Sequence, residues 1–260
     1  MKPEFTCYLR MGYPFRIMNG RGYSRPLPLF LVAVILFSGM TALALIPSRV
    51  VTYYTVSSMG ISIGKVKTSQ HITEEGGVQT VHFETRAAIN ASFLWSGYHQ
   101  DTMERGTLRN GTLVHYSRSG LENSTAVDIE GKLDATSFHF YIHEENGTTR
   151  LVSIPRSSFV HTTMECPEAR LDFSTHSRVT LPILDVEKMM VVKREYHLLE
   201  NTYYTIGGKK VPCRMVEFSD KNKKSKRWIN WDGTTVLMYR QDGNGGSGSY
   251  SVKADSVAHE

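Results

Sequence analysis

The stretch Val51-Thr-Tyr-Tyr-Thr-Val-Ser-Ser-Met-Gly-Ile-Ser-Ile-Gly-Lys-Val-Lys-Thr68 decides the fold class. Its first eight residues are rich in β-branched and aromatic side chains, which favour a strand, and Met59-Gly60 interrupts them. Residues 61–68 then alternate apolar and polar side chains, the pattern of a half-buried strand. Two such runs on either side of a short glycine-containing break predict a β-hairpin.

The same period of two continues along the chain. Turn signals separate the strand-like runs at Glu74–Gly77, Asn110-Gly111, Asn146-Gly147, Gly207-Gly208, Asp232-Gly233, Asp242-Gly243 and the glycine-rich residues 243–248. In residues 138–143 the alternation places Phe138, Phe140 and Ile142 on one face of a strand. The spacing predicts an all-β fold, either a single strongly curved antiparallel sheet or an open or closed barrel. At most one short helix, or a covering turn, is expected at residues 182–190.

A sheet of this size must bury one face or close on itself. Its wide apolar interior is either filled by side chains or open to an apolar ligand. Six aromatic residues are candidate ligand contacts, with core packing as the alternative for each: Trp95, Tyr98, Tyr141, Trp228, Trp231 and Tyr239.

Residues 26–48 carry no charge, and five Lys/Arg residues precede them. The stretch ends near Ala42-Leu43-Ala44, a small-x-small pattern typical of signal-peptidase sites. We therefore expect a signal peptide over residues 1–44, cleaved near Ala42 or Ala44, or else an uncleaved anchor over residues 29–46. The start is Met1, Met11 or Met18. A β-rich exported domain over 45–254 and a frayed tail over 255–260 follow, which predicts a location in the periplasm or cell envelope, free or anchored in the inner membrane.

The net charge of +5 belongs mainly to the N-terminal region. Five of the 30 Lys/Arg and one of the 25 Asp/Glu precede residue 26, which leaves 25 basic and 24 acidic residues. A nearly neutral domain gives no argument for a nucleic-acid partner. The one strong basic run is 221–227, interpreted as a soluble loop that protects neighbouring strands, with contact to anionic headgroups as the alternative.

Cys166 and Cys213 are a candidate disulfide in an exported protein, and two separate buried thiols are the alternative. Four Asn-x-Ser/Thr sequons begin at Asn90, Asn110, Asn123 and Asn146. In a eukaryotic secretory protein they would be glycosylation candidates. In a bacterial protein they would be residues of turns.

The histidines and carboxylates do not form a recognisable catalytic or metal motif. Four residues along a strand span about 13 Å, so His139 and His143 are too far apart to share one tetrahedral ion, and we expect no metal or other cofactor. Asp172, Ser174 and His176 supply the residue types of a hydrolytic triad, but the chain has no Gly-x-Ser-x-Gly motif. The pairs Glu74-Glu75 and Glu144-Glu145 are expected in solvated turns.

Three stretches resemble exported bacterial proteins of unknown function, the domain of unknown function 3108 and 6134 groups. Residues 54–66 are similar to their opening hairpin, 184–192 to a central Leu-Asp segment without its usual glycine, and 227–243 to a closing Trp-x-Asp hairpin. The resemblance implies a secreted or envelope-associated curved β domain, and favours the bacterial interpretation of the sequons. Relatives of that shape include carriers and chaperones of lipoproteins.

These observations predict a non-enzymatic envelope protein that binds a lipid or acyl chain, a glycan or an envelope protein partner through its curved sheet. The alternatives are a periplasmic hydrolase that depends on His139 or His176, and a scaffold subunit of an envelope complex. A carrier role follows from fold analogy, since the resemblance supplies no catalytic residues.

Overall fold

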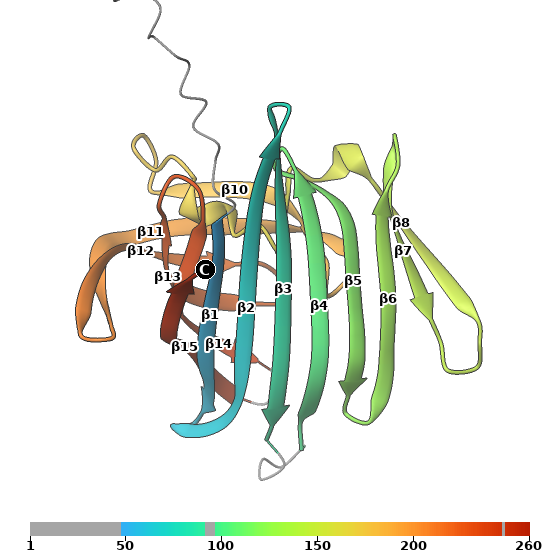
Figure 1. Cartoon of the computed structure of the whole chain (residues 1–260), viewed down its shortest axis with the longest axis horizontal. Helices are drawn as coiled ribbons and strands as arrows, with labels where there is room; N and C mark the ends of the chain where they lie inside the picture. Colours follow the sequence, from blue (N-terminus) through green and yellow to red (C-terminus); the bar gives the residue numbers. More distant parts are fainter. Residues whose placement is uncertain (1–47, 92–96, 246–247) are drawn as a thin grey trace, which may run out of the picture. The chain divides into compact units, whose positions relative to one another are not determined.

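The computed structural model describes residues 48–91, 97–245 and 248–260. They form one sheet of 15 strands (Figure 1). The strands are β1 (Ser48–Ser58), β2 (Ile61–Glu75), β3 (Val78–Asn90), β4 (His99–Arg109), β5 (Thr112–Glu122), β6 (Thr125–Leu133), β7 (Ser137–His143), β8 (Thr149–Pro155), β9 (His161–Thr162), β10 (Arg178–Asp185), β11 (Met190–Ile206), β12 (Lys209–Ser219), β13 (Lys224–Trp231), β14 (Val236–Gly245) and β15 (Gly248–His259).

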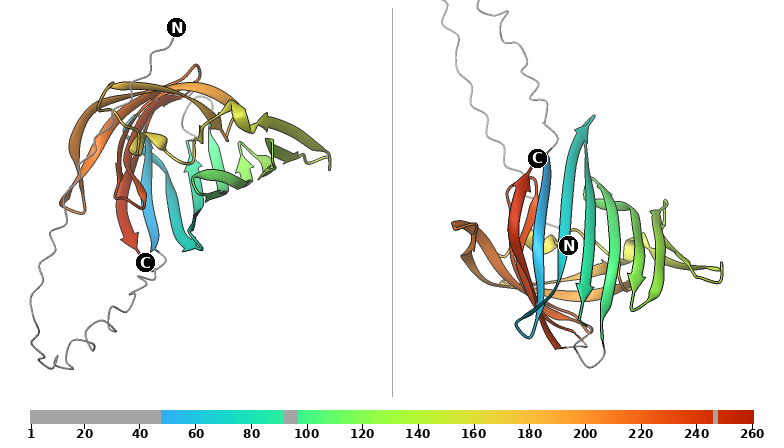
Figure 2. Two further views of the ribbon diagram at one scale, coloured as in Figure 1. Left: turned by 90° about the horizontal axis from the view of Figure 1, so that it is seen from above. Right: turned by 60° about the horizontal axis from the view of Figure 1, so that its bottom comes forward.

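The sheet order is β8-β7-β6-β5-β4-β3-β2-β1-β15-β14-β13-β12-β11-β10-β9. All neighbours are antiparallel except β9 and β10, which are parallel. The sheet is strongly curved and stays open, with β8 and β9 at its two ends (Figure 2). The prediction of a single curved, all-β sheet is therefore confirmed.

The segment between β8 and β10 contains the only described helical turns, η2 (Arg156–Ser158) and η3 (Pro167–Ala169), both of the 3-10 type. The short helix considered for residues 182–190 is not present. Residues up to Asp185 belong to β10, which pairs with β11, and a turn follows over 186–189. The apolar residues of β10 are buried as strand residues: Ile183 and Leu184 are both fully buried.

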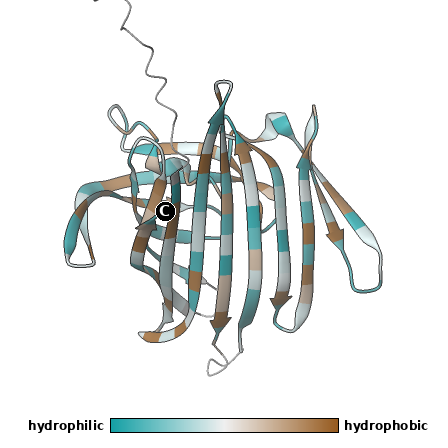
Figure 3. Ribbon diagram, in the orientation of Figure 1, coloured by the Kyte–Doolittle hydropathy of each residue, from teal (hydrophilic) through white to brown (hydrophobic). Residues whose placement is uncertain are grey.

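Alternation along the strands separates an inner face from an outer face, and Figure 3 shows hydrophilic and hydrophobic residues alternating along the front strands. Phe138 and Phe140 are fully buried as predicted, and they pack with Tyr116 in the core beneath β5–β8. Gly131 makes this packing possible. A Cβ atom at Gly131 would lie 2.6 Å from Cε1 of Phe138, so only glycine fits beneath the ring.

Two hydrogen bonds join β1 and β2 to β14, which is not their neighbour in the sheet. The hydroxyl of Tyr54 on β1 donates to the carbonyl of Met238 on β14 at 2.9 Å, and Nε2 of Gln70 on β2 donates to the carbonyl of Val236 at 2.6 Å. The described pairing of β14 with β15 covers residues 240–245 of β14, so these carbonyls lie where that ladder has ended. The two side chains thus tie the curled sheet across its interior.

Three expectations about local structure need correction or lie outside the described residues. The tail 255–260 does not fray, because β15 extends to His259 and pairs with β1. Asp242-Gly243 lies inside β14, where the missing side chain of Gly243 leaves room for the Tyr250 hydroxyl. The predicted signal peptide, Ala42 and Ala44, and the anchor 29–46 lie outside the described residues. Within the described ranges, no helix is long and apolar enough to cross a bilayer.

We predict that Tyr54→Phe lowers the free energy of unfolding by about 1 kcal/mol, because the Met238 carbonyl loses its hydrogen bond. The control is Tyr53→Phe on the same strand, where 43% of the side chain is exposed and a change within about 0.5 kcal/mol is expected. Urea denaturation followed by fluorescence measures both. Equal stabilities of the two variants would contradict a closing role for Tyr54.

Candidate functional site

One row of polar residues crosses five strands on the inner face of the sheet. The pairing places Thr52 opposite Thr68, Thr68 opposite Thr85, Thr85 opposite Glu104 and Glu104 opposite Arg118. Each residue belongs to a different strand, from β1 to β5, and each lies directly beside the next. Inward positions of a sheet usually carry apolar side chains that pack in the core. The polar side chains of this row show that the interior beside it is lined by polar groups.

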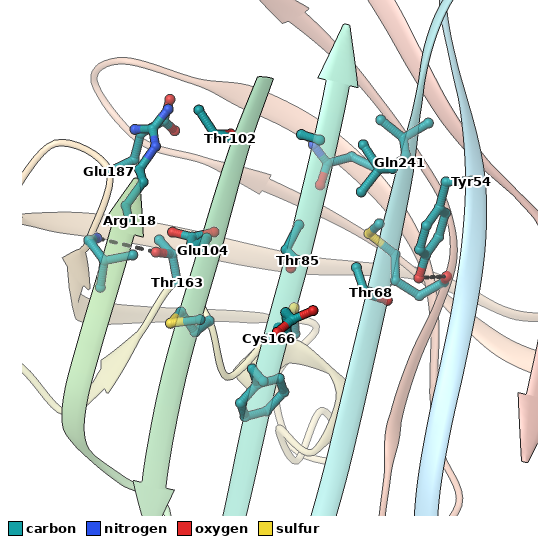
Figure 4. Close-up of a pocket in the computed structure, with 18 of the residues that line it drawn as sticks. Tyr54, Thr68, Thr85, Thr102, Glu104, Arg118, Thr163, Cys166, Glu187 and Gln241 are labelled. Carbon is teal, nitrogen blue, oxygen red and sulfur yellow. Dashed lines mark hydrogen bonds between the residues drawn. The ribbon is translucent and has the colours of Figure 1, made fainter. Parts of the chain in front are cut away.

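This row borders an interior cavity of about 420 Å³. Figure 4 shows Thr68, Thr85 and Thr102 on neighbouring strands, with Glu104, Arg118 and Glu187 at one side. The β8–β10 segment and strands β10–β15 supply the remaining walls, including Cys166, Arg194, Arg227 and Gln241. Val66, Ile89, Met238 and Val252 form apolar parts of the lining. The cavity is therefore mixed in character, with hydroxyl, amide and charged groups beside aliphatic ones.

Glu104 is the carboxyl group nearest the centre of the polar row. The Tyr116 hydroxyl donates a 2.7 Å hydrogen bond to its Oε1. Burial raises the pKa of Glu104 above the ordinary carboxyl value, although this hydrogen bond and Arg118 act in the opposite direction. The Arg118 guanidinium donates to Glu122 at 2.8 Å instead of bonding Glu104. Glu104 therefore holds its proton more tightly than an ordinary glutamate does.

Arg227 holds the β8–β10 segment against β13. Its Nη1 donates to Oε1 of Glu168 at 2.6 Å and to Sγ of Cys166 at 3.3 Å, and its Nε donates to Gln241 at 2.6 Å. Glu168 is fully buried. Burial raises the pKa of the Cys166 thiol to about 11, so this cavity-lining sulfur is a neutral thiol at neutral pH.

Arg194 makes a similar contact on the neighbouring wall. It donates to Asp220 at 2.7 and 2.9 Å, and its side chain is 4% exposed. The guanidinium groups of Arg194 and Arg227 lie 4.9 and 4.6 Å from the ring centre of Phe218, which is itself buried. A single aromatic ring thus supports both arginines through cation–π contacts.

The arginines of the cavity are already neutralised. Each one that lines it forms an ion pair of 2.6–2.8 Å with a carboxylate: Arg118 with Glu122, Arg194 with Asp220, and Arg227 with Glu168. Their charge is therefore used within the protein. The lining groups outside these ion pairs include the threonine hydroxyls, the Glu104 carboxyl and two oppositely charged side chains, Glu187 and Lys223.

None of the predicted aromatic residues within the described ranges lines this cavity. Trp95 lies outside the described residues. Tyr98 comes nearest, because its hydroxyl donates to Gln100, a lining residue. Tyr239 is buried and stacks on Tyr204 at 5.6 Å, and Trp231 is 44% exposed. Tyr141 is half-buried on β7, and Trp228 lies under Arg240 on the outer face. A ligand-binding role for these residues stays a prediction, and the cavity points to other residues.

The candidate disulfide is wrong for this structure, since Cys166 and Cys213 are both free. The reason is the direction of the side chains on β12. Arg214 donates to the carbonyl of Leu171 in the segment that contains Cys166. Its neighbour Cys213 points to the opposite face of the strand, where it packs with Leu237 and Tyr239.

His139 does have a carboxylate and a hydroxyl beside it. Its Nε2 lies 2.8 Å from Oδ2 of Asp134, and its Nδ1 lies 2.8 Å from Oγ of Ser153. The same cross-strand pairing of histidine with a hydroxyl recurs at His82 with Thr107 and at His143 with Thr149. This repetition favours surface pairing within the sheet, and none of these residues lines the cavity.

Asp172, Ser174 and His176, the candidate hydrolytic triad, are not brought together. The Ser174 amide donates to Asp172, and His176 contacts the hydroxyl of Thr175. Among the residues that the structure describes, no three His, Cys, Asp or Glu side chains gather to hold a metal ion.

Three sequon asparagines have roles in turns. The side-chain oxygen of Asn110 accepts the amide of Gln79, and that of Asn123 accepts the amide of His99. Both residues have positive φ angles, which asparagine tolerates well. Asn146 accepts the amide of Thr148. Asn90 ends β3.

Comparisons with known proteins assign the chain to no family. No protein-family model matches the chain, and no curated protein matches it. Among solved structures, it is similar to the crystal structure of a beta-barrel-like protein of domain of unknown function DUF1849 from Brucella abortus. The TM-score is 0.49 at 12% sequence identity, over 83% of this chain and 98% of that chain. The resemblance to the domain of unknown function 3108 and 6134 groups stays a prediction.

We predict that Arg227→Met lowers the free energy of unfolding by about 3–5 kcal/mol, because it leaves the buried Glu168 carboxylate without its partner. Adding Glu168→Gln should recover part of this loss. In the control Arg178→Met, the removed ion pair with Glu195 is exposed and is worth at most about 1 kcal/mol. Urea denaturation measures all three, and similar losses in both single variants would contradict the assignment.

We also predict a pH effect from Glu104. In the window above the ordinary carboxyl pKa, the folded state keeps a proton that the unfolded state has lost, so stability falls as pH rises through the raised pKa. Glu104→Gln removes this contribution. The stability of the variant relative to the wild type should therefore increase between pH about 5 and about 8.

Glu130→Gln is the control for this pH effect. A hydrogen bond from Lys132 lowers the pKa of the Glu130 carboxyl, so the carboxylate stabilises the fold above the ordinary pKa and its contribution is lost in acid. Between pH about 5 and about 8 the Glu130 carboxylate is ionised in both the folded and the unfolded state, so the relative stability of this variant should not change over that range. Urea denaturation at the two pH values distinguishes them, and a parallel change in both variants would refute the Glu104 prediction.

Proposed function

We propose that the protein is a non-enzymatic binding protein whose interior cavity holds a small, neutral, hydroxyl-rich ligand, such as a sugar unit of an envelope glycan. The observation that supports this most directly is the inward polar row from Thr52 to Arg118. The row presents hydroxyl and carboxyl groups on neighbouring strands, about 4.8 Å apart, so several of them can bond the hydroxyl groups of one small polyol. The cavity volume of about 420 Å³ falls within the roughly 300–1,000 Å³ of small-molecule sites.

An acyl chain fits this lining less well. It would cover Thr68, Thr85 and Glu104 without offering hydrogen bonds, and each polar group left unpaired costs about 1–3 kcal/mol. The aliphatic residues Val66, Ile89 and Val252 suit the carbon face of a sugar ring as well as they suit a hydrocarbon. Among the ligands considered from the sequence, the lining therefore favours the glycan.

The charge arrangement supports a ligand without net charge, because Glu187 and Lys223, the lining charges outside the arginine ion pairs, have opposite signs. An anion would have to compete with Glu122, Asp220 and Glu168 for arginines that are already paired. Burial raises the pKa of Glu104, and the oxygens of this carboxyl can accept hydrogen bonds from the hydroxyl groups of a ligand. The raised pKa of the Cys166 thiol supports binding over nucleophilic catalysis.

The location and the competing functions stay predictions. Export would place this cavity among the glycans of the periplasm or envelope. A hydrolase that uses His139 and a scaffold subunit of an envelope complex are the alternatives.

We expect isothermal titration with a panel of neutral mono- and disaccharides to find a saturable ligand with one site per chain. Thr85→Val keeps the shape of the side chain and removes its hydroxyl, so affinity should fall about fivefold, the equivalent of one hydrogen bond. The matched control is Thr80→Val on the outer face of the same strand, β3, where affinity should not change.

Titration with laurate distinguishes the acyl alternative. Saturable laurate binding that Thr85→Val leaves unchanged or strengthens, together with no binding of any saccharide, would overturn the glycan proposal in favour of an acyl ligand.

A further inference from the structure

The outer face of β12–β15 carries a second hollow, next to the β1–β2 turn. Its volume is about 570 Å³, and its lining includes Lys224, Lys226, Trp228, Arg240, Asp242 and Lys253. Met59, which is 72% exposed, lies at its edge. Lys224, Lys226 and Trp228 point away from the interior cavity, because they alternate along β13 with Arg227, which lines that cavity.

Positive charge exceeds negative charge in this outer groove. Four basic residues line it, against the two carboxylates of Glu217 and Asp242. Lys224 pairs with Glu217 at 3.1 Å and Arg240 pairs with Asp242 at 2.6 Å, so both carboxylates already have a basic partner. Lys226 and Lys253 form no ion pair with any residue in the described ranges.

The register also places two of these cations side by side. Arg240 lies directly opposite Lys253 on neighbouring strands. Like charges at such positions destabilise a sheet, and a bound anion between them would relieve the repulsion. Ser57, Asn244 and Ser249 add hydroxyl and amide donors around the groove, whereas the Ser251 hydroxyl already donates to Asp242 at 2.7 Å.

We propose that this outer groove is a second binding site, independent of the interior cavity, and that it takes a phosphate group. A phosphate offers several strong acceptor oxygens and up to two negative charges, which matches two unpaired lysines beside several neutral donors. The group could belong to a soluble phosphorylated compound or to a lipid headgroup, since both present the same chemistry.

The test is isothermal titration of the full chain, in a neutral detergent, with inorganic pyrophosphate. We expect one saturable site in the groove, which is weakened at least about tenfold in the double variant Lys226→Glu/Lys253→Glu. The control Lys209→Glu/Lys210→Glu makes the same change of charge at the far end of β12 and should bind as the wild type does. Binding should also weaken with added sodium chloride.

A milder pair, Lys226→Gln/Lys253→Gln, keeps the test valid if charge reversal disturbs folding, and should weaken binding in the same direction. Competition with soluble dihexanoyl phosphatidylglycerol tests whether the bound phosphate belongs to a lipid headgroup or to a soluble compound. Displacement of pyrophosphate supports the groove with a lipid headgroup as ligand, whereas pyrophosphate binding without displacement supports it with a soluble phosphate. The proposal is overturned if pyrophosphate does not bind, or if the groove and control variants bind it equally.

Discussion

The buried ion pair between Arg227 and Glu168 is the interaction on which the interior depends. Glu168 is fully buried, so its carboxylate is tolerated only where a partner cation is fixed beside it. Arg227 is fixed in turn by Gln241, whose amide donates to the Tyr250 hydroxyl. One chain of contacts therefore links the β8–β10 segment to β13, β14 and β15, and determines where that segment crosses the interior.

The position of this segment explains why the interior is only partly filled. Met164 packs over Gly106, where a Cβ atom would lie 2.6 Å from its sulfur, and the core beneath β5–β8 is closed there. Thr163, Met164 and Cys166 of this segment line the cavity on one side, and Thr68, Thr85 and Glu104 line it from the inner faces of β2–β4. Polar lining and open space thus coincide, as a binding cavity requires.

Much of the fold could be predicted from local pattern, whereas the cavity could not. The hairpin around Met59-Gly60 and the inward face of Phe138 and Phe140 follow from the period of two and from turn residues, which act over a few positions. The polar row depends on the register between strands far apart in sequence. A threonine in an alternating run does not reveal which residue will lie opposite it. We predicted ligand contacts at large aromatic residues, but one of them, Tyr239, is buried and packs in the core.

The basic run 221–227 shows how strand geometry divides one stretch of sequence between two tasks. Its last residues lie on β13, where neighbouring side chains point to opposite faces. Arg227 faces inward, because a guanidinium can bond Glu168, Gln241 and Cys166 together and stack on Phe218. Lysine lacks that planar set of donors, and Lys226 faces the outer groove. The two cations therefore differ in position because they differ in what they can bind. The run 221–227 resembles a uniform solvated loop in sequence, but it contains both a structural anchor, Arg227, and a charge on the outer face, Lys226.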